Sequence, residues 1–249
     1  MLPTLAREGF KRDFRRLDPS KIRIVLIEGG PRLLAAFPES LSARAYRDLE
    51  ELGVECRTGA IVTRVTDEAV YIGDERIATR TVLWAAGNAA SPLVRAMGIP
   101  VDRAGRAEVN PDLSVPGHPH VFVVGDAAAV EGAPGLAAAA NQMGAHAARM
   151  IARTLAGAPR ETFRYRDKGS MAVIGRGRAV VDFGRIKLTG VLAFNSWLLL
   201  HLLYLAGFRN RLSVLIEWGY AYFTYRPSAR LITRDDAHAV SPRQDSSLR

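Results

Sequence analysis

The 249-residue sequence is poor in cysteine and lacks the signatures of several common enzyme classes. Its single cysteine, Cys56, excludes an internal disulfide framework, a cysteine-based zinc site and a CxxC redox pair. Its five histidines show no spacing such as HExxH, and no Ser-His-Asp arrangement stands out. The sequence therefore predicts neither a metal site nor a hydrolase. With 48% hydrophobic and 24% charged residues, it is not a disordered or collagen-like chain.

Acidic residues are too few to balance the basic ones, so the net charge is +9 and an anionic partner is expected. The excess is concentrated in residues 160–187, which carry eight basic and three acidic side chains. Leu188–Phe208 follows directly, with 21 residues and no formal charge. The aromatic residues lie in the apolar stretches and are not interleaved with the basic ones. This pattern favours an anionic lipid surface over nucleic acid, although a solvated basic face beside a core helix would look similar.

The apolar segment is long enough to cross a bilayer, since about 20 residues suffice. Only Trp197–Ala206 is densely apolar, however, which indicates a buried or interfacial helix. A second helix is predicted after Arg209, and its apolar positions share one face: Leu212, Leu215, Ile216, Gly219, Tyr222 and Phe223. The two helices are predicted to form a monotopic membrane anchor.

The remaining chain alternates predicted strands and helices, which indicates an α/β fold. A helix is expected within residues 1–18, and Ile22–Ile27 reads as a buried strand of a parallel sheet. Helices are predicted at Glu39–Leu52, where Gly53 would form the C-cap, and at about Gly135–Leu155. Further short strands are expected at residues 54–56, 60–65, 70–72, 80–84, 121–124, 172–174 and 179–183.

Three strand ends carry candidate cofactor-binding residues. Glu28 follows the first strand, where a carboxylate can bind ribose hydroxyls, although a solvated cap would look the same. Ala85, Ala86 and Gly87 end the segment TVLWAAG, where small side chains allow either a close ligand approach or simple packing. Gly125 and Asp126 end VFVVGD at the edge of a sheet where cofactors bind, the alternative being a helix cap.

These segments together resemble the type II NADH dehydrogenase family, the single-subunit NADH:quinone oxidoreductases of the two-dinucleotide-fold flavoproteins. The resemblance is carried by FRRLDPSKIRIVLIEGGPRLLAAFP, TVLWAAGNAASPL, HVFVVGDAAAV, APGLAAAANQMGAHAARMI, FRYRDKGSMAVIGRGRAVVDF and LLYLAGFRNRLSVLIEWGYAYFTYRPSARLI. Sulfide:quinone oxidoreductases also associate with membranes, but they need paired cysteines, which a chain with Cys56 alone cannot supply by itself. The resemblance implies FAD and NADH as cofactors and a membrane quinone as acceptor, at the cytoplasmic face of the cell membrane.

The resemblance also implies roles for individual residues. Glu28 would bind the adenosine ribose of NADH, and Ala85, Ala86 and Gly87 would line the nicotinamide side. Gly125 and Asp126 would hold the ribityl chain of FAD, with Ala128 following near the flavin.

Two further residues are implied beside the reacting groups. Gln142 matches a glutamine beside the flavin and quinone, and Lys168 matches a lysine near the isoalloxazine ring. Ala138 and Met143 stand where the family usually has glutamines, a departure that bears on quinone contacts.

Both GxGxxG loops of the family are missing from this sequence, so the resemblance is to the C-terminal part of a full enzyme. The expected fold is a partial two-dinucleotide-binding (Rossmann-like) flavoprotein fold followed by membrane-associating helices. Residues 1–100 would be the remainder of the NADH-binding domain and 101–157 the C-terminal part of the FAD-binding domain. Residues 158–232 would form the membrane-association domain and 233–249 a disordered tail.

Three functions remain open at this stage. The first is a truncated NADH:quinone oxidoreductase, inactive alone, which a homodimer or an N-terminal chain would complete. The second is a membrane-associated remnant without catalysis, and the third is a flavoprotein reductase with a soluble acceptor.

Overall fold

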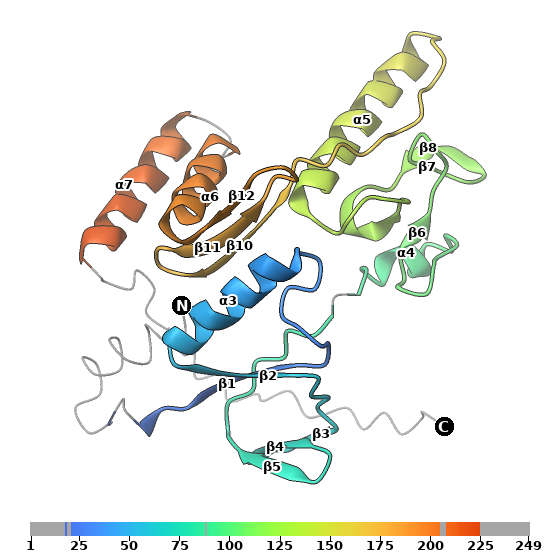
Figure 1. Cartoon of the computed structure of the whole chain (residues 1–249). Coiled ribbons are helices and arrows are strands. Elements are labelled where there is room, and N and C mark those ends of the chain that lie inside the picture. The colour runs from blue at the N-terminus through green and yellow to red at the C-terminus, as the bar shows by residue number, and fades with distance from the viewer. Residues whose placement is uncertain (1–17, 19–20, 88, 205–207, 225–249) are drawn as a thin grey trace, which may run out of the picture. The chain divides into compact units, whose positions relative to one another are not determined.

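The computed structural model describes residues 18, 21–87, 89–204 and 208–224, and the chain divides into two compact units. One unit comprises Met1–Gly59, Met171–Val181 and Leu188–Arg249, and the other comprises Ala60–Ser170 and Asp182–Lys187. The helix expected before Asp18 and the tail expected at 233–249 lie outside the described residues. Each unit is described by itself below (Figure 1).

The first unit begins with a strand, a helix and a parallel strand, as predicted. β1 (Ile24–Glu28) pairs with β2 (Val54–Thr58), with Ile24 opposite Val54 and Glu28 opposite Thr58. α3 (Glu39–Glu51) ends at Leu52, and Gly53 then adopts φ +79°, which suits a glycine C-cap. β1 was predicted to be buried, but all five of its residues are only half-buried because β2 is its one strand neighbour here.

A three-stranded sheet in the same unit is covered by a helix on each face (Figure 1). It consists of β10 (Ser170–Gly175), β11 (Arg178–Asp182) and β12 (Lys187–Thr189), and confirms the predicted strand pair. Side chains alternate between the faces, as a strand requires. Val180 packs with Leu41 of α3, whereas Val181 packs with Ala193 of α6 (Gly190–Tyr204).

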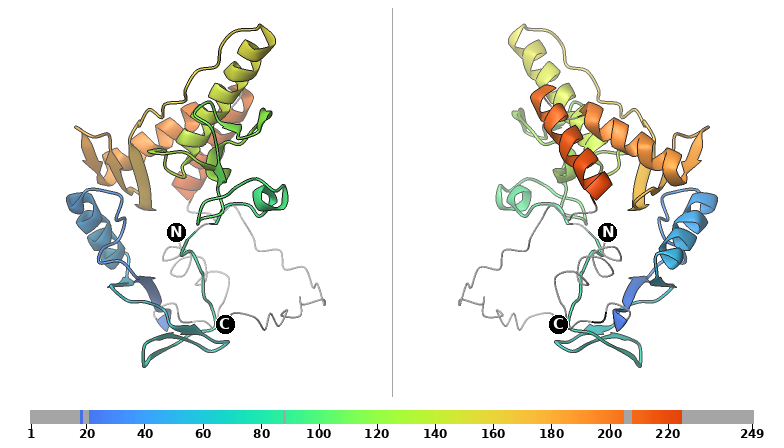
Figure 2. Two further views of the ribbon diagram at one scale, coloured as in Figure 1. Left: turned by 90° about the vertical axis from the view of Figure 1, so that its right-hand side faces the viewer. Right: turned by 90° about the vertical axis from the view of Figure 1, so that its left-hand side faces the viewer.

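The two C-terminal helices lie against each other (Figure 2). α7 (Phe208–Thr224) contacts α6 through Trp218, which stacks on Trp197 with ring centroids 5.8 Å apart. These two tryptophans therefore join the helices. No helix within the described part of the chain is long and apolar enough to span a bilayer.

The second unit begins with an antiparallel meander of β3 (Arg64–Val65), β4 (Ala69–Ile72) and β5 (Glu75–Ala78). β5 was not predicted, although Gly73-Asp74 between apolar runs is a hairpin signal. The other short elements are α4 (Leu93–Ala96), β6 (Ala107–Glu108), β7 (Ser114–Val115), β8 (His118–Phe122), a 3₁₀ turn η3 (Gly125–Ala127) and β9 (Ala128–Ala129). The alanine-rich helix is confirmed as α5 (Ala137–Leu155).

One predicted strand is wrong and another forms only in part. Residues 80–84 form no strand, and Leu83 and Trp84 are 69% and 65% exposed. The segment 121–124 was expected to be a buried strand, but only its first two residues belong to a strand, β8, which is largely exposed and pairs with the buried β7. An apolar run becomes a buried strand only where neighbouring strands and covering layers exist; among the described residues, 80–84 have no strand partner and β8 has only β7.

Candidate functional site

In the first unit, Glu28 is the last residue of β1. Its Oε1 accepts a hydrogen bond of 2.7 Å from the backbone N–H of Gly30. Gly30 is needed there, since a Cβ at this position would lie 3.2 Å from the same oxygen. Gly59, just after β2, donates its N–H to the carbonyl of Gly30 at 2.7 Å and closes the loop onto the sheet edge. The carboxylate is thereby held at the carboxyl end of the parallel pair, where the sequence placed it.

Ala85, Ala86 and Gly87 lie in irregular, exposed backbone of the second unit. Gly87 adopts φ +86°, and a Cβ there would meet nothing within 4 Å. The small side chains therefore do not serve internal packing in the described structure, which was the alternative explanation for them.

Gly125, Asp126 and Ala128 gather at the start of α5. The N–H of Gly125 lies 3.2 Å from the sulfur of Met143, and a Cβ on Gly125 would lie 3.3 Å from the Cβ of Ala140. Gly125 also has φ +69°, so both its conformation and its contact with α5 favour glycine. Ala128 is 4% exposed in the core behind it.

Asp126 itself is exposed, and its Oδ1 would lie 3.5 Å from a Cβ on Gly135. The first turn of α5 carries no acidic residue, and no side chain caps it. An uncapped N-terminus next to glycine-lined backbone suits an anionic or hydroxyl-rich ligand.

Gln142 and Lys168 are joined through the segment that returns along α5. Gln142 donates from Nε2 to the carbonyl of Arg166 at 3.0 Å and accepts the N–H of Arg166 on Oε1, also at 3.0 Å. Lys168 is exposed two residues further on. Sequence reasoning missed this pairing, because a backbone group 24 positions away has no side-chain signature.

His146 is 3% exposed and packs edge-on against Phe163, with ring centroids 5.4 Å apart. It is thus a packed core histidine. Its Nε2 lies 3.1 Å from the carbonyl oxygen of Glu161, so it supports the same returning segment.

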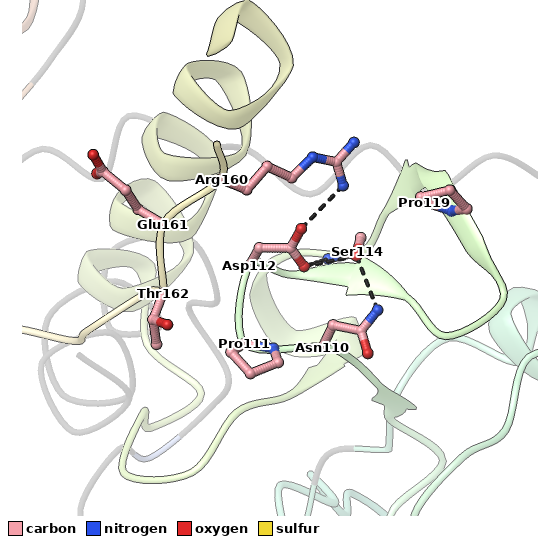
Figure 3. A pocket seen from close by; sticks show the side chains of 8 residues that line it. All are labelled: Asn110, Pro111, Asp112, Ser114, Pro119, Arg160, Glu161 and Thr162. Carbon is pink, nitrogen blue, oxygen red and sulfur yellow. Dashed lines mark hydrogen bonds and ion pairs between the residues drawn. The ribbon is translucent and has the colours of Figure 1, made fainter. Parts of the chain in front are cut away.

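A pocket of about 400 Å³ in the second unit was not foreseen (Figure 3). Arg160 forms an ion pair with Asp112 at 3.0 Å, and Asp112 also accepts the hydroxyl hydrogen of Ser114 at 2.6 Å. Burial raises the pKa of Asp112, but hydrogen bonds from Ser114 and Arg160 lower it further, leaving it below its ordinary 3.8. Arg160 and Asp112 thus satisfy each other's charge, which indicates a structural role.

The outer surfaces of α6 and α7 are rich in exposed apolar side chains. Leu192 is 71% exposed and Ile216 is 63% exposed. Others exposed on the two helices are Val191, Leu199, Leu203, Leu212 and Leu215. This surface follows the basic residues 160–187 in the chain, as the sequence analysis noted.

The structure brings part of the predicted site together. Gly125, Asp126, Ala128 and Gln142 are organised around α5 in the second unit, with Lys168 at the end of the segment that α5 holds. Glu28 belongs to the first unit.

Comparison with known proteins identifies two family matches. Residues 13–144 match the pyridine nucleotide-disulphide oxidoreductase family, and residues 168–227 match the NDH2 C-terminal domain. The type II NADH:quinone oxidoreductase Ndh of Mycobacterium tuberculosis is 41% identical over 247 residues, which are 94% of this chain and 53% of that protein. NdhA of the same organism is 40% identical over 88% of this chain and 49% of its own length. The chain therefore spans about half the length of these curated relatives.

Solved structures show the same fold. NDH2 from Plasmodium falciparum in complex with NADH aligns over 92% of this chain and 63% of its own, with a TM-score of 0.78 and 17% identity. The sulfide:quinone oxidoreductase of Aquifex aeolicus aligns over 81% of this chain and 53% of its own, with a TM-score of 0.61 and 14% identity. The expected Rossmann-like flavoprotein fold is thereby confirmed.

Proposed function

The chain belongs to the pyridine nucleotide-disulphide oxidoreductase family, as a relative of the type II NADH:quinone oxidoreductases, and from this premise we propose that it takes part in electron transfer from NADH through FAD to a membrane quinone. The observation that carries the proposal is the cluster at the start of α5. There, glycine backbone, an exposed carboxylate and an uncapped helix start lie together, at the residues where the family resemblance implies the flavin site.

The described residues fit FAD in chemical type. The carboxylate of Asp126 can accept hydrogen bonds from ribityl hydroxyls, and the close packing of Gly125 on Ala140 leaves no room for a side chain where the backbone turns. FAD, when bound, supplies the acceptor for a hydride and the donor of two electrons. The work of this chain is to hold and orient that group, with Ala128 and Lys168 on its flavin side.

For NADH, Glu28 supplies the acceptor for the adenosine ribose hydroxyls. The hydrogen bond from Gly30 occupies Oε1 and fixes the orientation of the carboxylate. Its negative charge also disfavours a 2′-phosphate, so NADH is preferred to NADPH. Ala85, Ala86 and Gly87 leave space for the nicotinamide.

The outer surface of α6 and α7 is proposed to dock peripherally on the cytoplasmic face of the cell membrane. The exposed leucines and isoleucine would enter the headgroup boundary, and the basic residues of 160–187 would attract anionic lipid. Each basic residue near such a surface contributes about 1 kcal/mol of attraction. Docking would bring the chain to its quinone.

The 249 residues contain no GxGxxG loop, so the pyrophosphates of both cofactors need donors from outside these residues. We propose that an N-terminal polypeptide of the family type, or a second copy of the chain in a homodimer, supplies them. Within the described chain we retain the proposed division at residues 100 and 157 into NADH-binding, FAD-binding and membrane-association parts.

The first experiment is the visible absorbance spectrum of the purified chain after incubation with FAD and desalting. A retained flavin band supports the proposal, and Asp126→Ala should weaken it. Glu131→Ala is the matched control, since it removes an exposed carboxylate five residues away in the same unit. Well-folded protein that retains no flavin would leave the chain without the proposed activity on its own. NADH oxidation with a soluble acceptor but not with quinone would favour the soluble-acceptor reductase.

Membrane docking is tested separately by flotation with vesicles that contain anionic lipid. Replacing Leu192 and Leu199 with asparagine should reduce the bound fraction severalfold, because both side chains would lose their apolar contact with lipid. Leu155→Asn is the control, since Leu155 is 85% exposed at the end of α5. Equal loss in the control, or no loss in the double variant, would contradict docking through α6.

A further inference from the structure

Residues 159–168 have no regular secondary structure, yet they run along α5, and one face of that helix holds their backbone at residues 159, 161 and 166 (Figure 1). We call this segment the strap. Arg153 donates from Nε to the carbonyl of Pro159 at 2.6 Å, and the N–H of Glu161 points to the sulfur of Met150 at 3.0 Å. The α5 residues 142, 146, 150 and 153 recur at helical spacing, so they line one face of the helix.

Gln142 makes the last and most specific of these contacts. A primary amide has a donor and an acceptor side by side, and here both are used on the N–H and carbonyl of one residue, Arg166. The side-chain amide of Gln142 thus bonds to Arg166 in the way that a backbone residue of an antiparallel strand bonds to the residue opposite it, with two hydrogen bonds exchanged. A side chain used in this way sets the register of the strap on the helix.

The other end of the strap is fixed as well. Gly169 adopts φ +91°, and its N–H donates to Oδ1 of Asp167 at 2.8 Å. A Cβ on Gly169 would collide with the carbonyl oxygen of Asp182 and lie 2.8 Å from Cδ1 of Phe183. Lys168 therefore lies between two anchored positions. Arg166 is hydrogen-bonded to α5, and Gly169 packs against the backbone at Asp182.

The same helix also holds the flavin side of the site. Met143, adjacent to Gln142, receives the N–H of Gly125, and Ala140 packs on the same glycine. One turn of α5 thus contacts both the backbone that carries Asp126 and the backbone that leads to Lys168.

We propose that Gln142 is a positioning residue, which fixes Lys168 through its paired hydrogen bonds to Arg166. This inference depends on the proposed function only for the role of Lys168 beside the flavin. It gives Gln142 an indirect role, beside the direct contact with flavin or quinone that the family resemblance implies.

The test measures amide hydrogen exchange in the strap of the 249-residue chain. The exchange is detected by mass spectrometry of peptides that cover residues 163–168. Gln142→Leu should increase the exchange rate of the Arg166 amide about tenfold, because its acceptor is lost. The reactivity of the Lys168 amine toward an acylating reagent should change at least about twofold in the same variant, since loss of register alters its surroundings. Asn141→Leu is the matched control, because Asn141 is an exposed amide one residue away.

A second variant separates register from general stability. In Gln142→Glu the ionised carboxylate can accept the Arg166 N–H but cannot donate to its carbonyl, whereas the protonated form can do both. The ionised variant should therefore lose part of the strap's protection, and that part, corrected for intrinsic exchange, should recover as the pH falls below the pKa of an ordinary glutamate, about 4.3. Two results would overturn the proposal. One is strap protection in Gln142→Glu that does not rise at low pH, and the other is unchanged exchange and unchanged Lys168 reactivity in Gln142→Leu.

Flavin retention distinguishes this inference from the proposed function. If every variant, including the parent, retains no flavin but the strap effects are found, Gln142 positions Lys168 and the proposed function fails. If flavin is retained and the strap effects are absent, the function stands and the positioning role is refuted.

Discussion

Replacing Arg178 with methionine should destabilise the first unit, because it removes one of two basic partners from a buried carboxylate. Asp48 on α3 is 1% exposed. Its Oδ1 lies 3.2 Å from Nη1 of Arg178 and 3.0 Å from Nε of Arg44. Its Oδ2 is buried without a hydrogen-bond partner. Methionine keeps most of the arginine stem, so the change removes the charge with little loss of packing.

The expected loss is about 2–4 kcal/mol in the free energy of unfolding. Breaking a fully buried ion pair from one side costs roughly 3–5 kcal/mol, because an uncompensated charge stays behind. The value here is lower, because Arg44 remains and Arg178 is itself 29% exposed. Arg178 also pairs with Glu51, but that carboxylate is 61% exposed and returns to water when the pair is lost.

The assay is urea unfolding followed by tryptophan fluorescence in a Trp84→Phe background. The remaining tryptophans, Trp197 and Trp218, lie in the same unit as Asp48, so the signal reports on that unit alone. Arg23→Met is the matched control. Arg23 pairs with Glu55 at a shorter distance of 2.7 Å, but both are exposed, so its loss should cost less than about 1 kcal/mol.

Removing both charges completes the test. Asp48→Leu combined with Arg178→Met should be more stable than Arg178→Met alone, because no unpaired charge remains in the interior. The reasoning is refuted if Arg178→Met costs no more than Arg23→Met, or if the double variant is less stable than the single one.

Three further outcomes are expected. The pKa of Asp112 in the folded protein lies below its ordinary 3.8, so the stability that this carboxylate contributes is present above pH 3.8 and is lost as the pH falls through the folded pKa. Measuring the free energy of unfolding against pH should show this loss, and Arg160→Met should make the loss smaller. Gly169→Ala should lower the thermal midpoint by several degrees, because of the positive φ and the collision with Asp182, and an unchanged midpoint would contradict the strap anchor. Burial raises the pKa of the Cys56 thiol, so alkylation at pH 8 should be slower than for free cysteine.

The sequence by itself determined the elements whose causes are local. α3 follows from its apolar period and from Gly53, which takes the left-handed conformation that ends the helix. The pair β10–β11 and helix α5 were predicted within a few residues for similar reasons. The family was also readable from its short motifs; Glu28 does end a strand, β1, whereas Asp126 lies in the 3₁₀ turn η3 beyond the end of β8.

Only the tertiary structure decided which apolar runs become strands and which polar groups meet. Residues 80–84 have the composition of a buried strand but form none, because a strand needs a partner that composition cannot supply. The pairing of Gln142 with Arg166 spans 24 positions, and that of Asp48 with Arg178 spans 130. Helix and turn preferences act over a few residues, whereas such hydrogen bonds and ion pairs depend on how segments distant in the sequence pack together.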